Sequence, residues 1–283
     1  MGATFKISVN DRLPLFVSLQ SPIMSDPAVS VEPSRPAPDE TRSVVKAAGL
    51  IGVATFSSRI LGFVRDMVLA RLFGATPAAD AFFVAYRIPN LLRELFAEGS
   101  MSAAFIPVFT EYHTLKTKRD AWELASATFT TLLTIVTAVT LLGILAAPGI
   151  VWLLAPGFRG SPDKLALTTL LTQMMFPYLI FISLAALAMG ILNSLRAFAA
   201  PAFSPVFFNI FTIACMVFLS PWLSEPIIGV AIGIVVGGVA QFAMQLPGLK
   251  GRGMLFGLWF QPGHPHKGWI CKTWEGELAL VSL

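Results

Sequence analysis

A chain of 283 residues could bury one or two soluble cores, but only 13% of this chain is charged and 55% is hydrophobic, whereas soluble domains carry roughly 25% charged residues. Lipid must therefore cover much of its surface, which excludes an ordinary soluble domain. The net charge of +4 does not indicate nucleic-acid binding, because the basic residues stand between apolar runs and form no stripe, and two cysteines give no disulfide framework or thiolate metal site.

The first 43 residues contain six prolines together with scattered Ser, Asp and Glu. Such a segment has too little apolar surface to fold, so we predict a disordered cytoplasmic extension over residues 1–43. The apolar run at residues 13–17 is too short, and too interrupted by Pro14, for a secretory signal peptide. An incorrect start site explains this segment equally well, since translation from Met24 would lose nothing recognisable.

Four windows further along the chain are long enough to cross a membrane, because a spanning helix needs about 20 mostly apolar residues. None of the four contains a charged residue. They lie between Glu123 and Arg159, Lys164 and Arg196, Arg196 and Glu225, and Glu225 and Lys250. Two earlier segments, about 45–72 and 78–108, are equally long and apolar but contain ionised side chains. The sequence therefore predicts an all-α, polytopic membrane bundle with six transmembrane helices in residues 44–254.

The short loops between these spans differ in their Lys and Arg content, which sets the orientation of a membrane protein. With the N-terminus inside, eight basic residues fall on the cytoplasmic side and three on the outer side. The cytoplasmic set is Arg42, Lys46, Lys116, Lys118, Arg119, Arg196, Lys250 and Arg252, and the outer set is Arg71, Arg159 and Lys164. The bias predicts that both ends of the six-span unit lie in the cytoplasm.

The first two spans contain charged residues at bilayer depth, where each charge costs roughly 2.5–3.5 kcal/mol on insertion scales. The first carries Arg59, Arg65 and Asp66, and the second carries Asp80, Arg87, Asn90, Arg93, Glu94 and Glu98. A spacing of seven residues returns to nearly the same face of a helix. Arg59 and Asp66 should therefore share one face, as should Asp80, Arg87 and Glu94.

Arginines outnumber acids deep in these two segments, and the surplus lies on Arg59, Arg65 and Arg93. Uncompensated positive charge of this kind favours binding of an anion. The alternative is that the charges pair within and between helices and only stabilise the bundle, or that they extend toward the membrane surface from near the helix ends.

Two further patterns concern helix packing. Pro89 lies inside the second span and predicts a kink, because it removes one backbone hydrogen bond. Three glycines at steps of four in the sixth span predict close approach of a second helix. They are Gly229, Gly233 and Gly237.

After Met254 the chain changes character, and no seventh span of adequate length follows. His264 and His266 lie in a Pro- and Gly-rich loop and are expected to bind no metal. The sequence contains no Gly-rich phosphate loop ending in Lys-Ser/Thr, no His-Glu-x-x-His and no Gly-x-Ser-x-Gly. We therefore expect a transporter without a cofactor, not an enzyme.

Several of these segments resemble the MviN/MurJ family of flippases. The first is residues 56–66, Phe-Ser-Ser-Arg-Ile-Leu-Gly-Phe-Val-Arg-Asp, and the second is residues 79–93, Ala-Asp-Ala-Phe-Phe-Val-Ala-Tyr-Arg-Ile-Pro-Asn-Leu-Leu-Arg. Shorter matches follow in order at 97–99 (Ala-Glu-Gly), 104–108 (Ala-Phe-Ile-Pro-Val), 154–158 (Leu-Ala-Pro-Gly-Phe), 176–178 (Phe-Pro-Tyr), 191–193 (Ile-Leu-Asn), 201–205 (Pro-Ala-Phe-Ser-Pro) and 245–247 (Gln-Leu-Pro). Together they cover about residues 44–255.

The resemblance implies the fold of the multidrug/oligosaccharidyl-lipid/polysaccharide exporter superfamily, in which two helical lobes surround a central cavity and open alternately. The implied substrate is lipid II, the undecaprenyl-pyrophosphate-linked peptidoglycan precursor, moved from the inner to the outer leaflet of the bacterial cytoplasmic (inner) membrane. The family's cavity is lined by arginines, an acid and small polar residues. The matching residues of this chain are Arg59, Arg65, Arg93, Asp80, Ser58 and Asn90.

Family members carry a second lobe, which the six spans predicted here do not provide. We therefore expect this chain to supply the N-terminal lobe only, with a missing C-terminal lobe or a second chain completing the cavity. Residues 255–283 do not resemble the family's next span and are expected to be a divergent tail, truncated or frameshifted. Two alternatives stay open: a truncated remnant that transports nothing, and an exporter of another lipid-linked polysaccharide or of drugs.

Overall fold

The computed structural model of the chain describes residues 38–94 and 100–254, which form helices and connecting turns and no strand. The predicted tail 255–283, and all of the predicted extension before residue 38, lie outside the described residues. The chain divides into two compact units after Thr41, and everything below concerns the second unit. The all-α class is confirmed for this part of the chain.

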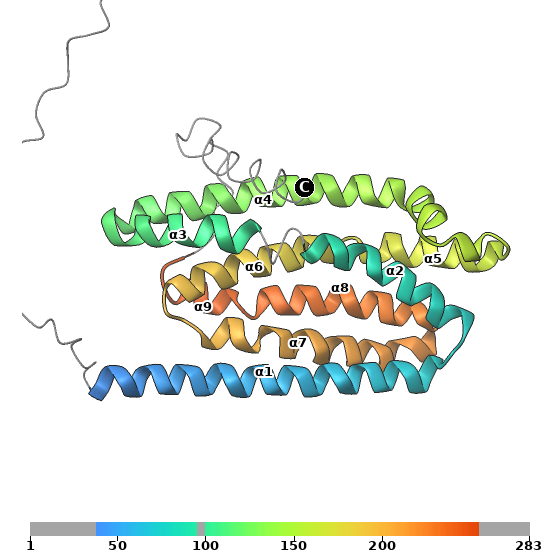
Figure 1. The fold of residues 1–283 in the computed structure, drawn as a ribbon, viewed down its shortest axis with the longest axis horizontal. Helices are drawn as coiled ribbons and strands as arrows, with labels where there is room; N and C mark the ends of the chain where they lie inside the picture. Colours follow the sequence, from blue (N-terminus) through green and yellow to red (C-terminus); the bar gives the residue numbers. More distant parts are fainter. Residues whose placement is uncertain (1–37, 95–99, 255–283) are drawn as a thin grey trace, which may run out of the picture. The chain divides into compact units, whose positions relative to one another are not determined.

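The helices follow one another with short connections (Figure 1). In chain order they are α1 (Pro38–Phe73), α2 (Pro77–Arg93), α3 (Ser100–Leu115), α4 (Lys118–Leu154), α5 (Pro162–Met175), α6 (Tyr178–Ser194), α7 (Ala199–Ala214), α8 (Ile227–Ala243) and α9 (Leu246–Lys250). A π-helical turn, Cys215–Leu219, and a 3₁₀ turn, Ser220–Trp222, continue α7.

Local sequence explains where two of these helices begin. Thr76 caps α2, because its hydroxyl accepts a hydrogen bond from the Ala79 amide at 3.3 Å, and Pro77 follows at the position where a missing N–H costs nothing. Thr117 and Asp120 cap α4 reciprocally, since each backbone amide donates to the other's side chain at 3.2 Å. The second cap ends the two-residue turn between α3 and α4.

Five described stretches are long and apolar enough to cross a membrane. They are Ala48–Phe73, Lys118–Leu154, Pro162–Ser194, Ala199–Trp222 and Ile227–Lys250. These stretches correspond to the first predicted span and to all four windows without charge. At 37 residues, α4 is about 55 Å long, which exceeds the roughly 30 Å of hydrocarbon in a bilayer, so it must tilt or project from the membrane.

The second predicted span is not one continuous helix in the described residues. α2 ends at Arg93 after 17 residues, and α3 begins at Ser100. α2 packs against α5 and α3 packs against α6. The two helices therefore lie one after the other along the span formed by α5 and α6. The predicted count of six spans is therefore not confirmed, because the described residues of this segment form two shorter helices, before and after residues 95–99.

The α5–α6 span forms the centre of the unit, and α1 lies at its periphery. In the most apolar window of Pro162–Ser194, which contains α5 and α6, 78% of the residues are buried. In the corresponding window of Ala48–Phe73, which belongs to α1, only 6% are buried. α6 contacts α3, α4, α7 and α8, whereas α5 contacts α2, α4 and α8. The apolar side chains of α1 are therefore mostly left for lipid to cover.

The glycine stripe on α8 packs against α7 and its continuation, as predicted. A Cβ on Gly237 would lie 2.8 Å from the Phe208 carbonyl oxygen, and one on Gly233 would lie 3.1 Å from the Thr212 carbonyl oxygen. The Thr212 hydroxyl donates to the Gly233 carbonyl at 3.1 Å. Small residues thus let the two backbones approach to hydrogen-bonding distance.

The basic residues predicted to be cytoplasmic gather at one end of the helices. The α3–α4 turn, the α6–α7 connection and α9 lie at that end, and the α1–α2 and α4–α5 connections lie at the other (Figure 1). At the first end the Trp122 indole donates to the Gly253 carbonyl at 2.8 Å, which joins α4 to the residues that follow α9.

Candidate functional site

The candidate site is built from α1 and α2, starting with Arg65 on α1. Its Nε and Nη2 atoms donate to Asp66 Oδ1 at 3.0 and 2.9 Å, and its Nη1 atom donates to Asn209 Oδ1 on α7 at 3.4 Å. The guanidinium carbon lies 5.9 Å from the centre of the Phe208 ring, which is within cation–π range. Arg65 is therefore not the uncompensated charge that the sequence predicted, because Asp66 pairs with it.

Arg59 differs from Arg65 in its surroundings. Its side chain is exposed, and no hydrogen bond or ion pair joins it to another described residue. Asp66 shares its face of the helix, as the spacing of seven predicted, but the longer side chain of neighbouring Arg65 reaches that carboxylate instead. Among the described residues, the positive charge of Arg59 within the α1 span therefore has no paired acid.

A second polar cluster lies near the end of α2. Arg93 Nε donates to Asn90 Oδ1 at 3.0 Å, and Asn90 Nδ2 donates to Glu94 Oε1 at 3.2 Å. Arg93 Nη2 lies 3.9 Å from the same Glu94 oxygen, at the limit of an ion pair. The side-chain amide of Asn90 thus connects the Arg93 guanidinium to the Glu94 carboxylate. The Glu94 side chain is more than half exposed.

Tyr86 also lies on α2, and its ring stacks on Phe82 with ring centres 5.8 Å apart. The charged groups whose field acts on its hydroxyl are Arg65, Asp66 and Arg93.

Asp80 lies apart from these arginines. Lys164 on α5 donates to Asp80 Oδ2 at 2.7 Å, and the same ammonium lies 4.1 Å from the centre of the Phe158 ring. Asp80 and Arg93 are separated by about 20 Å along α2, given a rise of 1.5 Å per residue. One phosphate group cannot reach both, so Asp80 belongs to the opposite end of the helix.

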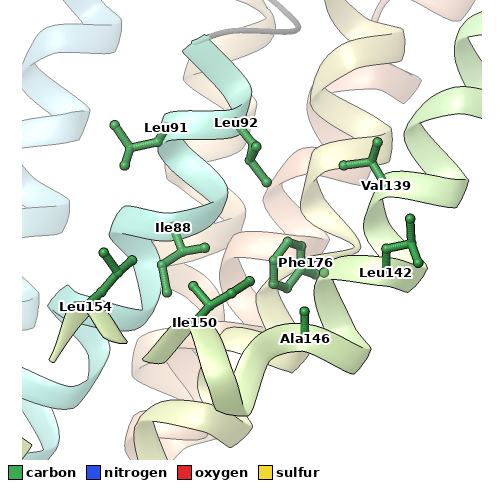
Figure 2. A pocket seen from close by; sticks show the side chains of 10 residues that line it. Ile88, Leu91, Leu92, Val139, Leu142, Ala146, Ile150, Leu154 and Phe176 are labelled. Atoms are coloured by element: carbon green, nitrogen blue, oxygen red, sulfur yellow. The ribbon is translucent and has the colours of Figure 1, made fainter. Parts of the chain in front are cut away.

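The other face of α2 is apolar and borders a crevice (Figure 2). Ile88, Leu91 and Leu92 face α4 across a volume of about 440 Å³, and the Phe176 ring lies in its wall. Because Asn90, Arg93 and Glu94 lie on the opposite side of the helix from these three residues, α2 separates the polar cluster from an apolar surface.

Sequence reasoning missed Asn209, Lys164 and Tyr86. Lys164 was assigned only to an outer loop, and Tyr86 was not distinguished from the aromatic residues around it. Asn209 lies in a window without charge, where a buried amide is costly unless it is hydrogen-bonded. The presence of a polar amide in an otherwise apolar window was the one feature of the sequence that could have identified Asn209.

Comparison with known proteins gives the same family by a family model, by curated relatives and by a solved structure. The family model described as lipid II flippase MurJ matches residues 69–279. The matched range includes Asp80, Asn90 and Arg93 but begins after Ser58, Arg59 and Arg65. It also extends into residues 255–279, where we had expected the chain to diverge.

Among curated proteins, the probable lipid II flippase MurJ of Vibrio cholerae is 44% identical over 222 residues, which cover 76% of this chain and 42% of that protein. The lipid II flippase MurJ of Burkholderia cenocepacia is 42% identical over 196 residues, which cover 69% of this chain and 38% of that protein. A solved structure, lipid II flippase MurJ in an inward closed conformation, has a TM-score of 0.64 and 29% identity, and the match covers 80% of this chain and 46% of that one. The chain thus spans less than half the length of the relatives that it matches.

Proposed function

Because this chain belongs to the MurJ family of lipid II flippases, we propose that its helices form the N-terminal lobe of a transporter that moves lipid II from the inner to the outer leaflet of the cytoplasmic membrane. In this proposal, the polar surface of α1 and α2 carries the headgroup while the hydrocarbon chain stays in the bilayer. The N-terminal end of the unit faces the cytoplasm, in agreement with the basic residues gathered at that end of the helices.

The observation that carries the proposal is the excess of guanidinium groups on α1 and α2. Among the described residues, Asp66 pairs with Arg65 and Glu94 lies beside Arg93, whereas no described acid pairs with Arg59; both acids are more than half exposed. Guanidinium presents planar, paired donors that match phosphate oxygens, and it holds its charge at any physiological pH. A pyrophosphate between the helices would supply the missing negative charge.

The proposed direction of transport agrees with the membrane potential. Moving one negative charge out of a cell that is negative inside is favourable by about 2.3 kcal/mol per 100 mV. The arginines make such a step possible, since they replace the hydration that a phosphate loses on leaving water.

The proposed activity depends on more than the described lobe. The matched relatives are more than twice as long as the matched region. We propose that a second helical lobe, in the same polypeptide or in another, closes the cavity over the polar surface of α1 and α2.

The test is a titration of the purified chain in lipid nanodiscs with lipid II, followed by native mass spectrometry. We expect Arg59→Ala and Arg93→Ala each to weaken binding about tenfold or more, because a hydrogen bond to a charged group contributes about 1.5–3 kcal/mol. Lysine at these positions should give intermediate affinity. Arg119→Ala is the matched control, since Arg119 is exposed on α4 and pairs with Glu123 at 3.1 Å.

Equal binding by all these variants would contradict the proposal. A second titration uses an undecaprenyl pyrophosphate that carries a different oligosaccharide. If it binds as tightly as lipid II, the lobe recognises the pyrophosphate alone, and the alternative of another lipid-linked polysaccharide exporter gains support.

A further inference from the structure

α1 has few contacts with the rest of the unit in the middle of its membrane span. The buried apolar side chains described on this helix are Ala54, Leu69 and Phe73, and the last two lie near its end. Between Ala54 and Leu69 the residues of the helix are exposed or only partly buried, so its position in this unit depends on a small number of contacts.

The principal polar contact in this stretch is made by Asn209 of α7. Its Nδ2 atom donates to the Ser58 carbonyl oxygen at 3.2 Å and to the Pro205 carbonyl oxygen of its own helix at 3.2 Å. Its Oδ1 atom accepts from Arg65 Nη1 at 3.4 Å. The side chain is 5% exposed, so both ends of the amide are used inside the protein.

The sequence of α1 is suited to this contact. Ser58, Gly62 and Arg65 fall at steps of four and three, which places them on one stripe of the helix. A Cβ on Gly62 would lie 3.9 Å from Asn209 Nδ2, an ordinary van der Waals distance, so the amide lies directly beside the α1 backbone at this residue. The stripe thus presents the Ser58 carbonyl as an acceptor and the Arg65 guanidinium as a donor on either side of Gly62.

An amide makes both interactions through two separate atoms. It donates through nitrogen to the Ser58 carbonyl and accepts through oxygen from the guanidinium. An aspartate would accept from Arg65 but could not donate to Ser58, and a leucine would do neither. Asp66 and Asn209 together engage three of the five N–H donors of Arg65, which leaves two for a ligand.

We propose that Asn209 is a positioning residue: it fixes α1 against α7 in the middle of the membrane and orients the Arg65 guanidinium toward the lipid-linked pyrophosphate. The second half of this inference rests on the proposed function, and the first half does not. Asn209 itself does not contact the substrate, and it acts through Arg65.

The first experiment measures the attachment of α1 without any substrate. Spin labels are placed at Phe63→Cys and Phe211→Cys, two exposed positions, in a chain whose Cys215 and Cys271 are replaced by serine. We expect Asn209→Leu to broaden the distance distribution between the labels in nanodiscs. Thr212→Val is the matched control, because it removes the buried α7–α8 hydrogen bond to Gly233 and does not involve α1.

The second experiment measures coupling to Arg65 through lipid II affinity. We expect Asn209→Leu to weaken binding about tenfold in the parent chain, as loss of one charge-assisted hydrogen bond does, and to have no further effect in an Arg65→Ala background. Asn209→Asp should keep the label distance narrow, because the carboxylate pairs with Arg65, yet weaken binding through repulsion of the phosphate.

The outcomes separate the two proposals. If the parent chain binds no lipid II but Asn209→Leu broadens the distance, the proposed function fails and the attachment of α1 stands. An unchanged distance, or an equal loss of affinity with and without Arg65, would overturn the positioning role.

Discussion

Lys164 and Asp80 form an ion pair at 2.7 Å that joins α5 to α2 across 84 positions of sequence. The ammonium is mostly buried, with 19% of its side chain exposed, whereas 59% of the Asp80 side chain is exposed. The pair fixes the beginning of α2 on the central span. It also explains why Asp80, which matches the cavity acid of the family, is not available to the arginines further along α2.

We predict that Asp80→Asn or Lys164→Ala lowers the thermal unfolding temperature of the detergent-solubilised chain by about 0.4–4 °C. A half-exposed pair contributes roughly 0.2–1 kcal/mol, and 1 kcal/mol corresponds to about 2–4 °C in a chain of this size. The exchanged pair Asp80→Lys with Lys164→Asp should recover part of the loss. Asp163→Asn, which removes a neighbouring exposed acid, is the control, and failure of the exchange to recover stability would count against the pair.

The second prediction concerns orientation in the membrane. With Cys215 and Cys271 replaced by serine, Gly160→Cys should react with a membrane-impermeant maleimide in intact spheroplasts. Arg119→Cys should react only after permeabilisation, because the basic residues at its end of the helices remain in the cytoplasm. Both positions are exposed, and nothing lies within 4 Å of a Cβ at residue 160. The reverse labelling pattern would show that the unit is inserted the other way.

Windows without charge predicted most of the helices because lipid imposes a simple requirement. A backbone that crosses hydrocarbon must satisfy its own hydrogen bonds over about 20 apolar residues. Lys118–Leu154 and Ile227–Lys250 meet that requirement by composition alone. The segment 78–108 was different, because α2 carries charges at Asp80, Arg87 and Arg93, and its hydrophobicity did not indicate that the described residues form two helices, α2 and α3.

The candidate site was predictable only in part. That Arg59 and Asp66 share a face of α1 followed from their spacing, but the pairing of Asp66 with Arg65 depended on side-chain reach, which helix periodicity does not describe. Asn209 and Lys164 lie 144 and 84 residues from their partners. Contacts of that separation are determined by how the helices pack, which no local pattern in a single sequence specifies.

The third prediction uses the glycine stripe of α8. Gly237→Ala should destabilise the chain by about 1–3 kcal/mol, because a methyl group there meets the Phe208 carbonyl oxygen at 2.8 Å and the backbone of α7 must move. Gly149→Ala on α4 is the matched control, since nothing lies within 4 Å of its added Cβ. We expect the control to unfold at the parent temperature or slightly above it. If Gly237→Ala unfolds at the parent temperature or above it, as the control does, close packing against α7 does not require glycine at this position.

The last prediction concerns a second glycine, whose neighbour is a side chain and can therefore be changed. A Cβ on Gly143 would clash with the Phe176 ring, which is fully buried in the wall of the crevice beside α2 (Figure 2). Gly143→Ala should cost about 1–3 kcal/mol of unfolding free energy, because the enclosed ring has little room to move.

Phe176→Leu removes the ring atoms that the new methyl group would meet. On its own it should also be destabilising, since it enlarges an existing cavity. Combined with Gly143→Ala, it should cost less than the sum of the two single changes by at least about 0.5 kcal/mol, which is the coupling expected of residues in direct contact. Thermal unfolding of the four proteins in one detergent measures this difference. Strict additivity would show that the methyl group and the ring do not meet, and that α4 passes Phe176 at a greater distance than the structure gives.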